Sequence, residues 1–392
     1  MRFPMRFRPG TVAPVLFLMA VPMLGAFSAI GAQTNAPAAP KTAIMLTQVA
    51  EGLERPWGLQ FLPDGRYLVT ELPGRLRVVG KDGSLGAPIT GVPEVYAKNQ
   101  GGLLDVALAP DYIDSGTIFL SFSQLRGNGA SATAVARGKL TLDGASGKLT
   151  DVKVIFQQEP PVPGSDRHFG SRIVVTPDGN LFVTTGDRGD RPDEAQNPAS
   201  TIGKVLYITQ DGKPALPSPA GEGWNPLVWS IGHRSVQGAA YDADKGVLWT
   251  VEHGPQGGDE LNLTEKGKNY GWPVITYGID YSGAKIGDGV QEKEGLEQPV
   301  YHWTPSIAVS GVLLYTGDLF PEWKGNLLAG ALKYMQVQRL VIEDGKVVQH
   351  EVVADDIGQR VRDVRQGPDG AVYLLTDERN GRIVRMEPAA TE

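Results

Sequence analysis

The sequence predicts an all-β protein, a six-bladed β-propeller whose blades are four-stranded antiparallel sheets. Six segments repeat one pattern, in which an apolar stretch is followed by a turn and then by a short strand rich in Val, Leu, Tyr or Thr. In the three clearest copies the turn is Pro-Asp-Gly, at residues 63–65, 177–179 and 368–370. Because Pro presets φ and Gly supplies a positive φ, each copy is typical of a β-hairpin. Repeats at intervals of about 45 to 80 residues, each long enough for about four strands, indicate a propeller.

The remaining copies and the composition agree with this fold class. The degenerate copies lie at residues 106–112, 239–246 and 313–325. The 392 residues are 41% hydrophobic, which is enough for a core, and the 50 Gly and 29 Pro suit a protein dense in turns. A propeller uses this length as one domain, and no window after residue 35 shows sustained helical periodicity.

The predicted blades follow the repeats in chain order and centre on residues 57–80, 101–125, 168–190, 228–265, 308–342 and 361–387. Residues 46–49 are strand-like but lie outside the first repeat. We expect them to pair with the C-terminal strands and close the ring, which removes exposed sheet edges. Three stretches, 126–167, 188–227 and 266–304, do not fit a minimal blade, and we expect them to be long inter-blade loops of the kind that carry function.

The N-terminal residues are typical of a targeting segment. Three Arg within the first eight residues precede the apolar residues 12–30, and a small Gly-Ala pair after them offers a cleavage point. We predict a signal peptide over residues 1–32, a linker over residues 33–45 and the propeller over residues 46–388. A retained membrane anchor is the alternative, and the Ala-, Pro- and Thr-rich linker favours cleavage over it.

The net charge and the number of cysteines limit which partners the protein can have and in which compartment it can function. The net charge of −7 becomes −10 when the predicted signal peptide, which holds three Arg and no acid, is removed. An acidic surface argues against nucleic acid as a partner. The chain has no Cys, and export without disulfides is common in bacteria because a closed β core of this size does not need them. We therefore expect a bacterial protein that is periplasmic or secreted.

Two motifs contain candidate catalytic side chains. His168 lies in Asp-Arg-His-Phe-Gly-Ser-Arg directly before a predicted strand, where a neutral imidazole near an axial pocket can act as a general base. Arg234 has Gly232 and Gly238 on either side, so a tight turn can present its guanidinium to a carboxylate or phosphate. The alternatives are a structural or surface His and an Arg that satisfies loop carbonyls.

The segment between Glu252 and Asn262 is a candidate cation loop. It contains Gly-Pro-Gln-Gly-Gly, which cannot remain in a regular ladder and leaves backbone carbonyls free to point at a cation. Carbonyl and carboxylate oxygens with flexible spacing suit Ca²⁺ better than Zn²⁺. The spacing is not that of an EF-hand loop, and an acidic inter-strand loop is the alternative.

A late basic group consists of Lys333, Arg360 and Arg362. Alternation at 360 and 362 puts both Arg on one face of a strand, where two cations repel unless an anion lies between them. A polyanionic small ligand would resolve this repulsion, and solvated surface charge is the alternative. The sequence contains no Ser-His-Asp order, Walker loop, CxxC or HExxH motif.

At these motifs the sequence resembles the soluble quinoprotein aldose sugar dehydrogenases, the glucose/sorbosone dehydrogenase-like propellers that bind pyrroloquinoline quinone (PQQ) and Ca²⁺. The resemblance runs from about residue 50 to residue 387 and rests on blocks that occur jointly and in order. The blocks are Arg55-Pro56-Trp57-Gly58, Gln100-Gly101-Gly102-Leu103-Leu104, His168-Phe169-Gly170-Ser171-Arg172, Gly232-His233-Arg234, Glu252-His253-Gly254-Pro255, Asn269-Tyr270-Gly271-Trp272-Pro273, Leu332-Lys333 and Arg360-Val361-Arg362-Asp363.

The resemblance implies a role for each residue that matches a family motif. His168 falls on the catalytic base, and Arg234 falls on the Arg beside the reacting quinone carbonyl. Besides these two, cofactor contacts are implied for Gln100, Ser235, His253, Lys333, Arg360 and Arg362. Metal ligands are implied at Gly254 and Pro255, whose carbonyls would hold a catalytic Ca²⁺, and at Glu260, Tyr270 and Asp280, which resemble a second, structural Ca²⁺ site.

The implied activity is PQQ- and calcium-dependent oxidation of aldose sugars at the anomeric carbon to lactones. His168 would take the proton of the anomeric hydroxyl as hydride passes to the quinone, whose oxygen Ca²⁺ polarises as a Lewis acid. The electrons would then leave to an external acceptor. The protein would act as a monomer or homodimer, without a stable membrane span after signal cleavage.

Three departures from the family pattern bear on the sugar. Arg167 stands where an Asp precedes the base, His253 stands where Gln is usual, and Ser235 stands where Asn is usual. These changes favour the broad aldose branch over the glucose-preferring one. Two other interpretations stay open: a calcium-dependent propeller lactonase or hydrolase, against which the late basic group argues, and a non-catalytic propeller that binds a protein or a glycan.

Overall fold

The computed structural model describes residues 34–390 of the chain, so the predicted signal peptide lies outside the described residues. Within them, no helix is both long and apolar enough to cross a membrane. Helical structure in this part of the chain is confined to α1 (Tyr112–Ser115) and to the 3₁₀ turns η1 (Gly127–Gly129), η2 (Pro192–Gln196) and η3 (Pro321–Trp323).

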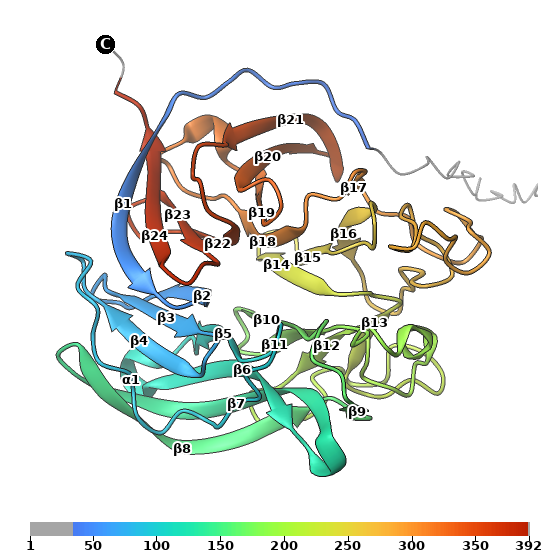
Figure 1. Ribbon diagram of the computed structural model, residues 1–392, viewed down its shortest axis with the longest axis horizontal. Coiled ribbons are helices and arrows are strands. Elements are labelled where there is room, and N and C mark those ends of the chain that lie inside the picture. Colours follow the sequence, from blue (N-terminus) through green and yellow to red (C-terminus); the bar gives the residue numbers. More distant parts are fainter. Residues whose placement is uncertain (1–33, 391–392) are drawn as a thin grey trace, which may run out of the picture. The chain divides into compact units, whose positions relative to one another are not determined.

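Six antiparallel sheets are arranged around a central axis as the blades of a propeller (Figure 1). The first two blades contain β2 (Pro56–Phe61), β3 (Tyr67–Glu71) and β4 (Arg75–Val79), then β5 (Leu103–Leu108), β6 (Thr117–Leu125), β7 (Ala130–Asp143), β8 (Ser146–Gln157) and β9 (Val162–Pro163). The next two contain β10 (Gly170–Val175), β11 (Leu181–Thr185), β12 (Lys204–Ile208) and β13 (Val228–Ile231), then β14 (Val236–Asp242), β15 (Val247–Glu252), β16 (Asp259–Thr264) and β17 (Tyr301–Trp303). The last two contain β18 (Val309–Leu314), β19 (Leu327–Ala331), β20 (Gln336–Glu343) and β21 (Lys346–Ala354), then β22 (Val361–Gln366), β23 (Val372–Thr376), β24 (Gly381–Pro388) and β1 (Ile44–Leu53).

The first strand of each blade lies nearest the axis, and the two ends of the described chain close the ring. The strands β2, β5, β10, β14, β18 and β22 each contact the corresponding strands of both neighbouring blades. The last sheet has the order β1-β24-β23-β22, with Ile44 opposite Pro388 and Leu53 opposite Gly381. The predicted pairing of residues 46–49 with the C-terminal strands is therefore confirmed.

The predicted six-bladed propeller is confirmed, although its blades are not uniform. Four of the six sheets have four strands, while β2–β4 form a three-stranded sheet and β9 adds to β7 at the side of a five-stranded one. The expectation that residues 126–167 form a loop is wrong, because β7, β8 and β9 occupy most of them. The strands β7 and β8 contain much Ala, Ser, Thr and Lys, and β8 faces solvent along much of its length. Neither of the two therefore shows the apolar run of a buried strand.

The other two stretches expected to be loops are only partly so. Residues 188–227 contain η2 and β12, and residues 266–304 end in β17. The remaining backbone of both stretches is irregular and contributes to the walls of the cavities described below.

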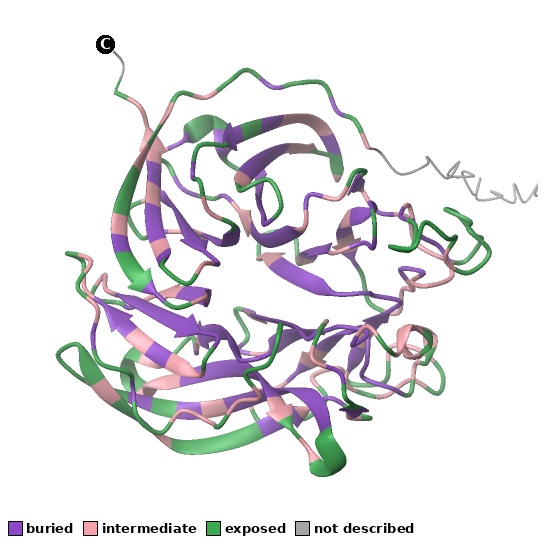
Figure 2. Ribbon diagram, viewed as in Figure 1, coloured by how far each residue is buried: buried purple, intermediate pink, exposed green. Residues whose placement is uncertain are grey.

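The hydrophobic core lies between the blades rather than at the axis. Between the first two blades, for example, Leu68, Leu76, Val106 and Leu120 pack together, and comparable clusters fill other interfaces. Figure 2 shows the inner strands almost wholly buried and the outer strand β8 largely exposed. Apolar burial therefore holds neighbouring sheets together and leaves the axis to polar side chains.

The first described residues, which fall in the predicted linker, pack on the fifth blade. The backbone N–H of Ala39 donates to the carbonyl of His350 in β21, and the N–H of His350 donates to the carbonyl of Pro37. Ala36 is buried in the same apolar cluster as residues of the fourth and fifth blades. Figure 1 shows this segment running past β21 before it enters β1.

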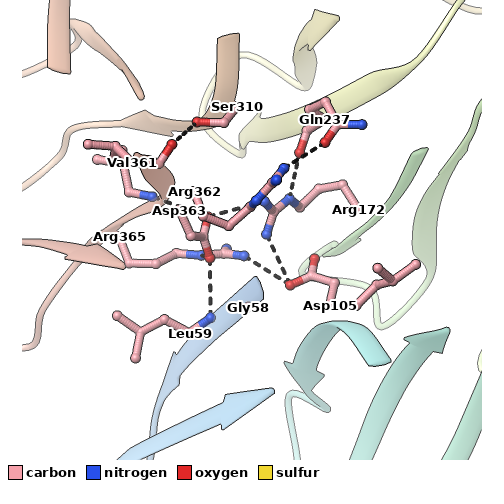
Figure 3. Close-up of polar contacts among 12 residues, drawn as sticks. Gly58, Leu59, Asp105, Arg172, Gln237, Ser310, Val361, Arg362, Asp363 and Arg365 are labelled. Carbon is pink, nitrogen blue, oxygen red and sulfur yellow. Dashed lines mark hydrogen bonds and ion pairs between the residues drawn. The ribbon is translucent and has the colours of Figure 1, made fainter. Parts of the chain in front are cut away.

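A buried network of charged side chains fills the axis (Figure 3). Each innermost strand has a register irregularity against its neighbour, and a bulge of this kind re-aims side chains. Arg172 contacts Asp105 through Nη1 at 3.0 Å and Asp363 through Nη2 at 3.3 Å. Arg365 contacts the same two carboxylates at 3.3 and 2.8 Å. Two guanidinium groups and two carboxylates thus form a closed, neutral group, which we call the axial ion network.

The two carboxylates also link neighbouring blades through the backbone. Oδ2 of Asp105 accepts a hydrogen bond from the N–H of Ile173 at 2.9 Å, and Oδ2 of Asp363 accepts one from the N–H of Leu59 at 3.2 Å. Burial raises the pKa of Asp105, and the two neighbouring guanidinium groups oppose that effect. A carboxylate buried this deeply stays ionised only while its cationic partners remain in place.

Replacing Asp105 by Asn is expected to lower the free energy of unfolding by about 3–5 kcal/mol, because the buried guanidinium of Arg172 and the partly buried guanidinium of Arg365 would then share one carboxylate. Urea unfolding followed by tryptophan fluorescence measures this change. Asp143→Asn, at an exposed position of the same blade, is the matched control, and its effect should stay within about 0.5 kcal/mol. Equal effects of the two substitutions would show that the axial ion network does not stabilise the ring.

Candidate active site

Two neighbouring cavities open where the innermost strands begin. The first, here called the axial cavity, has a volume of about 240 Å³ and is lined by Trp57, Leu104, Phe169, Gln237, His253, Leu332, Arg360 and Arg362. The second, here called the side cavity, has a volume of about 390 Å³ and is lined by His168, Asp187, Arg234, Pro255, Trp272, Asp280 and Tyr281. Another cavity, of about 510 Å³, lies at the opposite ends of the same strands and contains none of the predicted site residues.

His168 is held by its backbone and by one ring nitrogen. Its N–H donates to Oε1 of Gln100 at 2.8 Å, and its Nδ1 lies 2.6 Å from Oδ1 of Asp187. An ionised carboxylate only accepts hydrogen bonds, so Nδ1 carries the proton and Nε2 is the basic nitrogen. The side chain is 13% exposed, at the wall of the side cavity. The structure therefore places an oriented imidazole where the sequence predicted a base.

Asp187 is the residue that orients this imidazole. Its Oδ2 accepts a hydrogen bond from Nε1 of Trp272 at 2.8 Å, and its Oδ1 also accepts one from the N–H of Gly189 at 2.8 Å. Burial acts to raise the pKa of Asp187, but the hydrogen bond with His168 and the other donors hold this pKa below its ordinary value. Asp187 is therefore a carboxylate at neutral pH.

The pKa of His168 itself is lowered. Burial is the largest cause, and the positive charge of Arg234 adds to it, while the hydrogen bond with Asp187 acts in the opposite direction. The imidazole is therefore neutral at pH 7 and can accept a proton.

Arg234 is anchored at both ends. Its backbone N–H donates to Oε2 of Glu252 at 2.7 Å, and its Nη1 donates to the carbonyls of Gly254 at 2.8 Å and His253 at 3.1 Å. The guanidinium lies 5.3 Å from the ring centroid of Trp272. Arg234 thus satisfies loop carbonyls, one of the two alternatives, while it also lines the side cavity.

Four of the predicted cofactor contacts, Gln100, His253, Arg360 and Arg362, line the axial cavity. Arg362 contacts Oδ2 of Asp377 at 2.5 Å and Oε1 of Gln237 at 3.0 Å, while its Nε has no hydrogen-bond partner among residues 34–390. Arg360 is exposed at the rim of the cavity. Lys333 is also exposed, with its Nζ 5.1 Å from the ring centroid of Tyr334, and the cavity is lined by its neighbour Leu332 rather than by Lys333.

His253, which lines this cavity, lies beside Ser235, which does not. The N–H of His253 donates to the carbonyl of Ser235 at 3.1 Å, and Oγ of Ser235 accepts a hydrogen bond from Gln237 at 3.1 Å. Burial, followed by the charges of Arg362 and Arg234, lowers the pKa of His253 to about 3, so its ring is neutral. Its Nε2 is buried and finds no hydrogen-bond partner in the described part of the chain.

The residues predicted to form a second calcium site are only partly together. Glu260 lies opposite Glu252 in the sheet, and Nδ2 of Asn262 donates to both carboxylates, at 3.1 and 3.2 Å. Burial, and next the charge of Glu252, raise the pKa of Glu260 well above its ordinary value. The ring of Tyr270 stacks on that of His233, which in turn bonds Glu252.

Asp280 lies elsewhere: it lines the side cavity, and its Oδ1 accepts hydrogen bonds from the N–H and the hydroxyl of Ser282. Within residues 34–390, no group of three or more His, Cys, Asp or Glu side chains is placed to hold a metal ion. The side chains alone therefore do not form a metal site here, and backbone carbonyls would have to complete one.

A hydrogen-bonded Ser-His-Glu chain lies behind the cavities and was not predicted. Oγ of Ser230 lies 2.8 Å from Nε2 of His233, whose Nδ1 lies 2.9 Å from Oε1 of Glu252. The order of groups is that of a nucleophilic triad. All three side chains are buried, however, so none of them can reach a substrate. These hydrogen bonds instead hold Glu252 in place, where it accepts the backbone N–H of Arg234.

Sequence reasoning missed Asp187, Trp272, Gln237 and Asp377. Asp187 lies two residues after the strand β11 in a Gly-Asp-Arg-Gly turn, and an acid in a turn at the end of a predicted strand is the signal that could have identified it. Trp272 lies in one of the family blocks, which gave it no role, and Gln237 and Asp377 have no such local signal. The roles of all three arise from contacts with residues at least 15 positions away.

Comparisons with known proteins identify the family. The sequence profile of the Glucose / Sorbosone dehydrogenase family matches residues 53–385. The chain belongs to this family. It is 42% identical over 355 residues to the aldose sugar dehydrogenase YliI of Escherichia coli (strain K12), an alignment that covers 90% of this chain and 94% of that relative.

Solved structures agree with this assignment. A crystal structure of a glucose dehydrogenase is 43% identical and superposes with a TM-score of 0.83, covering 88% of this chain and 100% of the other. The PQQ-bound form of an aldose sugar dehydrogenase from Streptomyces coelicolor is 28% identical, with a TM-score of 0.71 and coverage of 89% and 99%. This glucose/sorbosone dehydrogenase family member is an oxidoreductase that acts on CH–OH groups of sugars, which excludes the lactonase and the non-catalytic alternatives.

Asp187→Asn is expected to lower the pKa of the His168 imidazole further, because the hydrogen bond and the charge that favour its protonated form are weakened. The chain has five His, so a histidine NMR titration can follow His168 once its signal is assigned by its loss in His168→Ala. Asp193→Asn, at an exposed carboxylate on η2, is the control and should leave the titration unchanged. An unchanged His168 pKa in Asp187→Asn would show that Asp187 does not control this ring.

Proposed function

We propose that this protein oxidises aldose sugars at the anomeric carbon to lactones, with PQQ and Ca²⁺ as cofactors and His168 as the general base. The observation that carries the proposal is the pair of His168 and Asp187. A neutral imidazole with one nitrogen fixed by a buried carboxylate presents its other nitrogen at a cavity wall, next to a second cavity rich in cations. This arrangement of groups is suited to removing a proton from a hydroxyl.

The axial cavity has the chemistry that PQQ requires. PQQ is a flat quinone with three carboxylates, and the cavity combines Arg360 and Arg362 with flat or apolar walls from Trp57, Leu104, Phe169 and Leu332. Two buried nitrogens there, Nε of Arg362 and Nε2 of His253, have no partner among the described residues. A buried polar atom without a partner costs about 1–3 kcal/mol, so a ligand with oxygen acceptors would be stabilised at this place.

The oxygen atoms needed for Ca²⁺ are also present. The carbonyl of Gly254 accepts a hydrogen bond from Arg234, but a carbonyl has a second lone pair, and the carbonyl of the adjacent Pro255 could share the same ion. The carboxylates of Glu252, which is buried, and of Glu260, which is partly buried, lie beside Oδ1 of Asn262, a buried atom with no partner in residues 34–390. A cation with oxygen ligands would relieve both the repulsion of the pair and the unpaired atom.

The residues of this chain would act on the sugar as follows. When bound, PQQ supplies the two-electron acceptor and Ca²⁺ the Lewis acid. Nε2 of His168 takes the proton of the anomeric hydroxyl, and Asp187 keeps the ring in place and stabilises the positive charge that it gains. Trp272 and Tyr281 line the side cavity, in which the sugar would bind.

The proposed substrate range is broad within the aldoses. At the rim of the side cavity stands Arg167, which pairs with Asp190 at 2.9 Å and is about half exposed, so this position offers no free carboxylate to a sugar hydroxyl. We further propose that the electrons pass to an external acceptor and that the protein acts as a monomer or homodimer in the periplasm or outside the cell.

Purified protein freed of ligands should oxidise aldoses with an artificial dye as electron acceptor only when both PQQ and Ca²⁺ are added. The absorbance of PQQ should shift on mixing, in a one-to-one ratio with the protein, because the cofactor passes from water into the axial cavity. A panel of aldoses then gives the sugar range. Absence of dye reduction with every aldose, together with an unchanged PQQ spectrum, would refute the proposal.

His168→Ala is expected to bind PQQ as the parent protein does and to lower kcat by about 10² to 10⁴-fold, because the general base is lost. In the parent protein, activity should fall with decreasing pH only below the ordinary histidine pKa of about 6.5, since His168 is inactivated when it is protonated and its pKa is lowered. His350→Ala, on the fifth blade, is the control and should keep full turnover. Undiminished kcat in His168→Ala would remove His168 from the mechanism.

A further inference from the structure

Arg188 is a buried cation without an acidic partner. Its side chain is fully buried, and no carboxylate within residues 34–390 lies at salt-bridge distance from it. Instead, its guanidinium makes five hydrogen bonds to neutral oxygens, donated to the carbonyls of Ser131, Ser165 and Arg167, to Oγ of Ser131 and to Oε1 of Gln158. Burying an unpaired charge is costly, so the side chain is held in place by many contacts that must act together.

Two of these hydrogen bonds and one ring contact hold the segment that carries His168. Nε of Arg188 donates to the carbonyl of Arg167 at 3.0 Å, and Nη2 donates to the carbonyl of Ser165 at 3.2 Å. The guanidinium carbon also lies 3.7 Å from the ring centroid of Phe169. The residues immediately before and immediately after His168 are therefore both bound by one side chain.

The same residue is tied to the partner of the imidazole and to the neighbouring blade. Arg188 follows Asp187 directly in the chain, and its own carbonyl accepts a hydrogen bond from Oγ of Ser165 at 2.6 Å. Toward the second blade, Nη1 and Nη2 bind the carbonyl and the hydroxyl of Ser131 in β7, at 3.0 and 2.8 Å. Arg188 thus connects the backbone of His168, the backbone of Asp187 and a rigid strand.

The backbone at both ends of this connection is in a strained conformation. His168 has φ of 49° and Arg188 has φ of 62°, both in the left-handed region. A residue other than Gly is disfavoured there by about 1–2 kcal/mol and keeps this conformation only when its surroundings impose it. The contacts of Arg188 supply that constraint on the His168 side and on its own.

We infer that Arg188 is a positioning residue that sets the direction of the His168 imidazole toward the side cavity. It touches neither cavity and acts through the carbonyls of Ser165 and Arg167 and the ring of Phe169. The inference rests on the proposed role of His168 as the base. The alternative is that Arg188 only holds the second and third blades together. In that case its replacement would lower the stability of the protein without any change at His168.

The test uses Arg188→Met, which keeps an unbranched apolar stem but removes the guanidinium, and Arg188→Lys, which keeps the charge. At saturating PQQ, Ca²⁺ and sugar, Arg188→Met is expected to lower kcat by about 10²-fold through misplacement of the imidazole, while KM for the sugar changes little. Arg188→Lys should recover part of kcat. Arg339→Met removes a comparable buried guanidinium, which pairs with Glu351 at 2.7 Å in the fifth blade, and is the matched control that should keep kcat.

Two readouts do not depend on turnover. Hydrogen exchange of residues 164–169 should become faster in Arg188→Met and not in Arg339→Met, because the local constraint is lost. In the histidine NMR titration, the pKa of His168 should rise toward its ordinary value as the ring becomes more exposed. Unchanged exchange and an unchanged His168 pKa, with only a lower unfolding midpoint, would overturn the inference.

These readouts also separate this inference from the proposed function. If the parent protein oxidises no aldose, the proposed function fails, and exchange and titration still decide whether Arg188 positions His168. If Arg188→Met does not fold, Ser131→Ala takes its place, because it leaves Arg188 present and removes the hydroxyl that binds both Nη2 of Arg188 and the carbonyl of Ser165. A smaller change in the same direction in kcat, exchange and pKa would support the inference, and no change in all three would overturn it.

Discussion

The axial ion network is the interaction on which the rest of the structure depends. Six innermost strands converge on the axis, and the space between them is filled by Asp105, Arg172, Asp363 and Arg365 instead of by an apolar cluster. Buried charges require partners in a definite geometry. The network therefore fixes the position along the axis at which the innermost strands of separate blades meet. Because the group is closed and neutral, it can remain buried between the cavities at one end of the strands and the cavity at the other.

At the candidate site, burial and neighbouring charged groups also act against each other. They hold neutral imidazoles close to an ionised carboxylate. Burial and nearby guanidinium groups keep His168 and His253 neutral, while donors around Asp187 keep it ionised in an environment that would otherwise favour the acid. The positive φ of His168 and the burial of the Arg188 charge without a salt-bridge partner both oppose folding locally. Such conflicts persist where the surrounding contacts over-determine the geometry, and they lie here around one imidazole.

The local sequence predicted correctly where blades begin. The Pro-Asp-Gly turns mark hairpins, and the strand-like residues near the start of the chain do pair with β24. Prediction failed for β7 and β8, whose polar and small residues are compatible with an outer strand as well as with a loop. At the site, the motifs singled out His168 and Arg234, but they grouped Asp280 with Glu260, and the structure instead places Asp280 in the wall of the side cavity.

The sequence by itself determined the fold class, the family and the side chains that gather at the mouth of the propeller, because turn chemistry, repeats and short motifs are local properties. Only the tertiary structure decided what those side chains contact. The ion pair between Asp105 and Arg365 joins residues 260 positions apart, and the hydrogen bond between Trp272 and Asp187 joins residues 85 apart. Contacts at such separations arise only when the ring closes, and no local pattern encodes which partners closure will bring together.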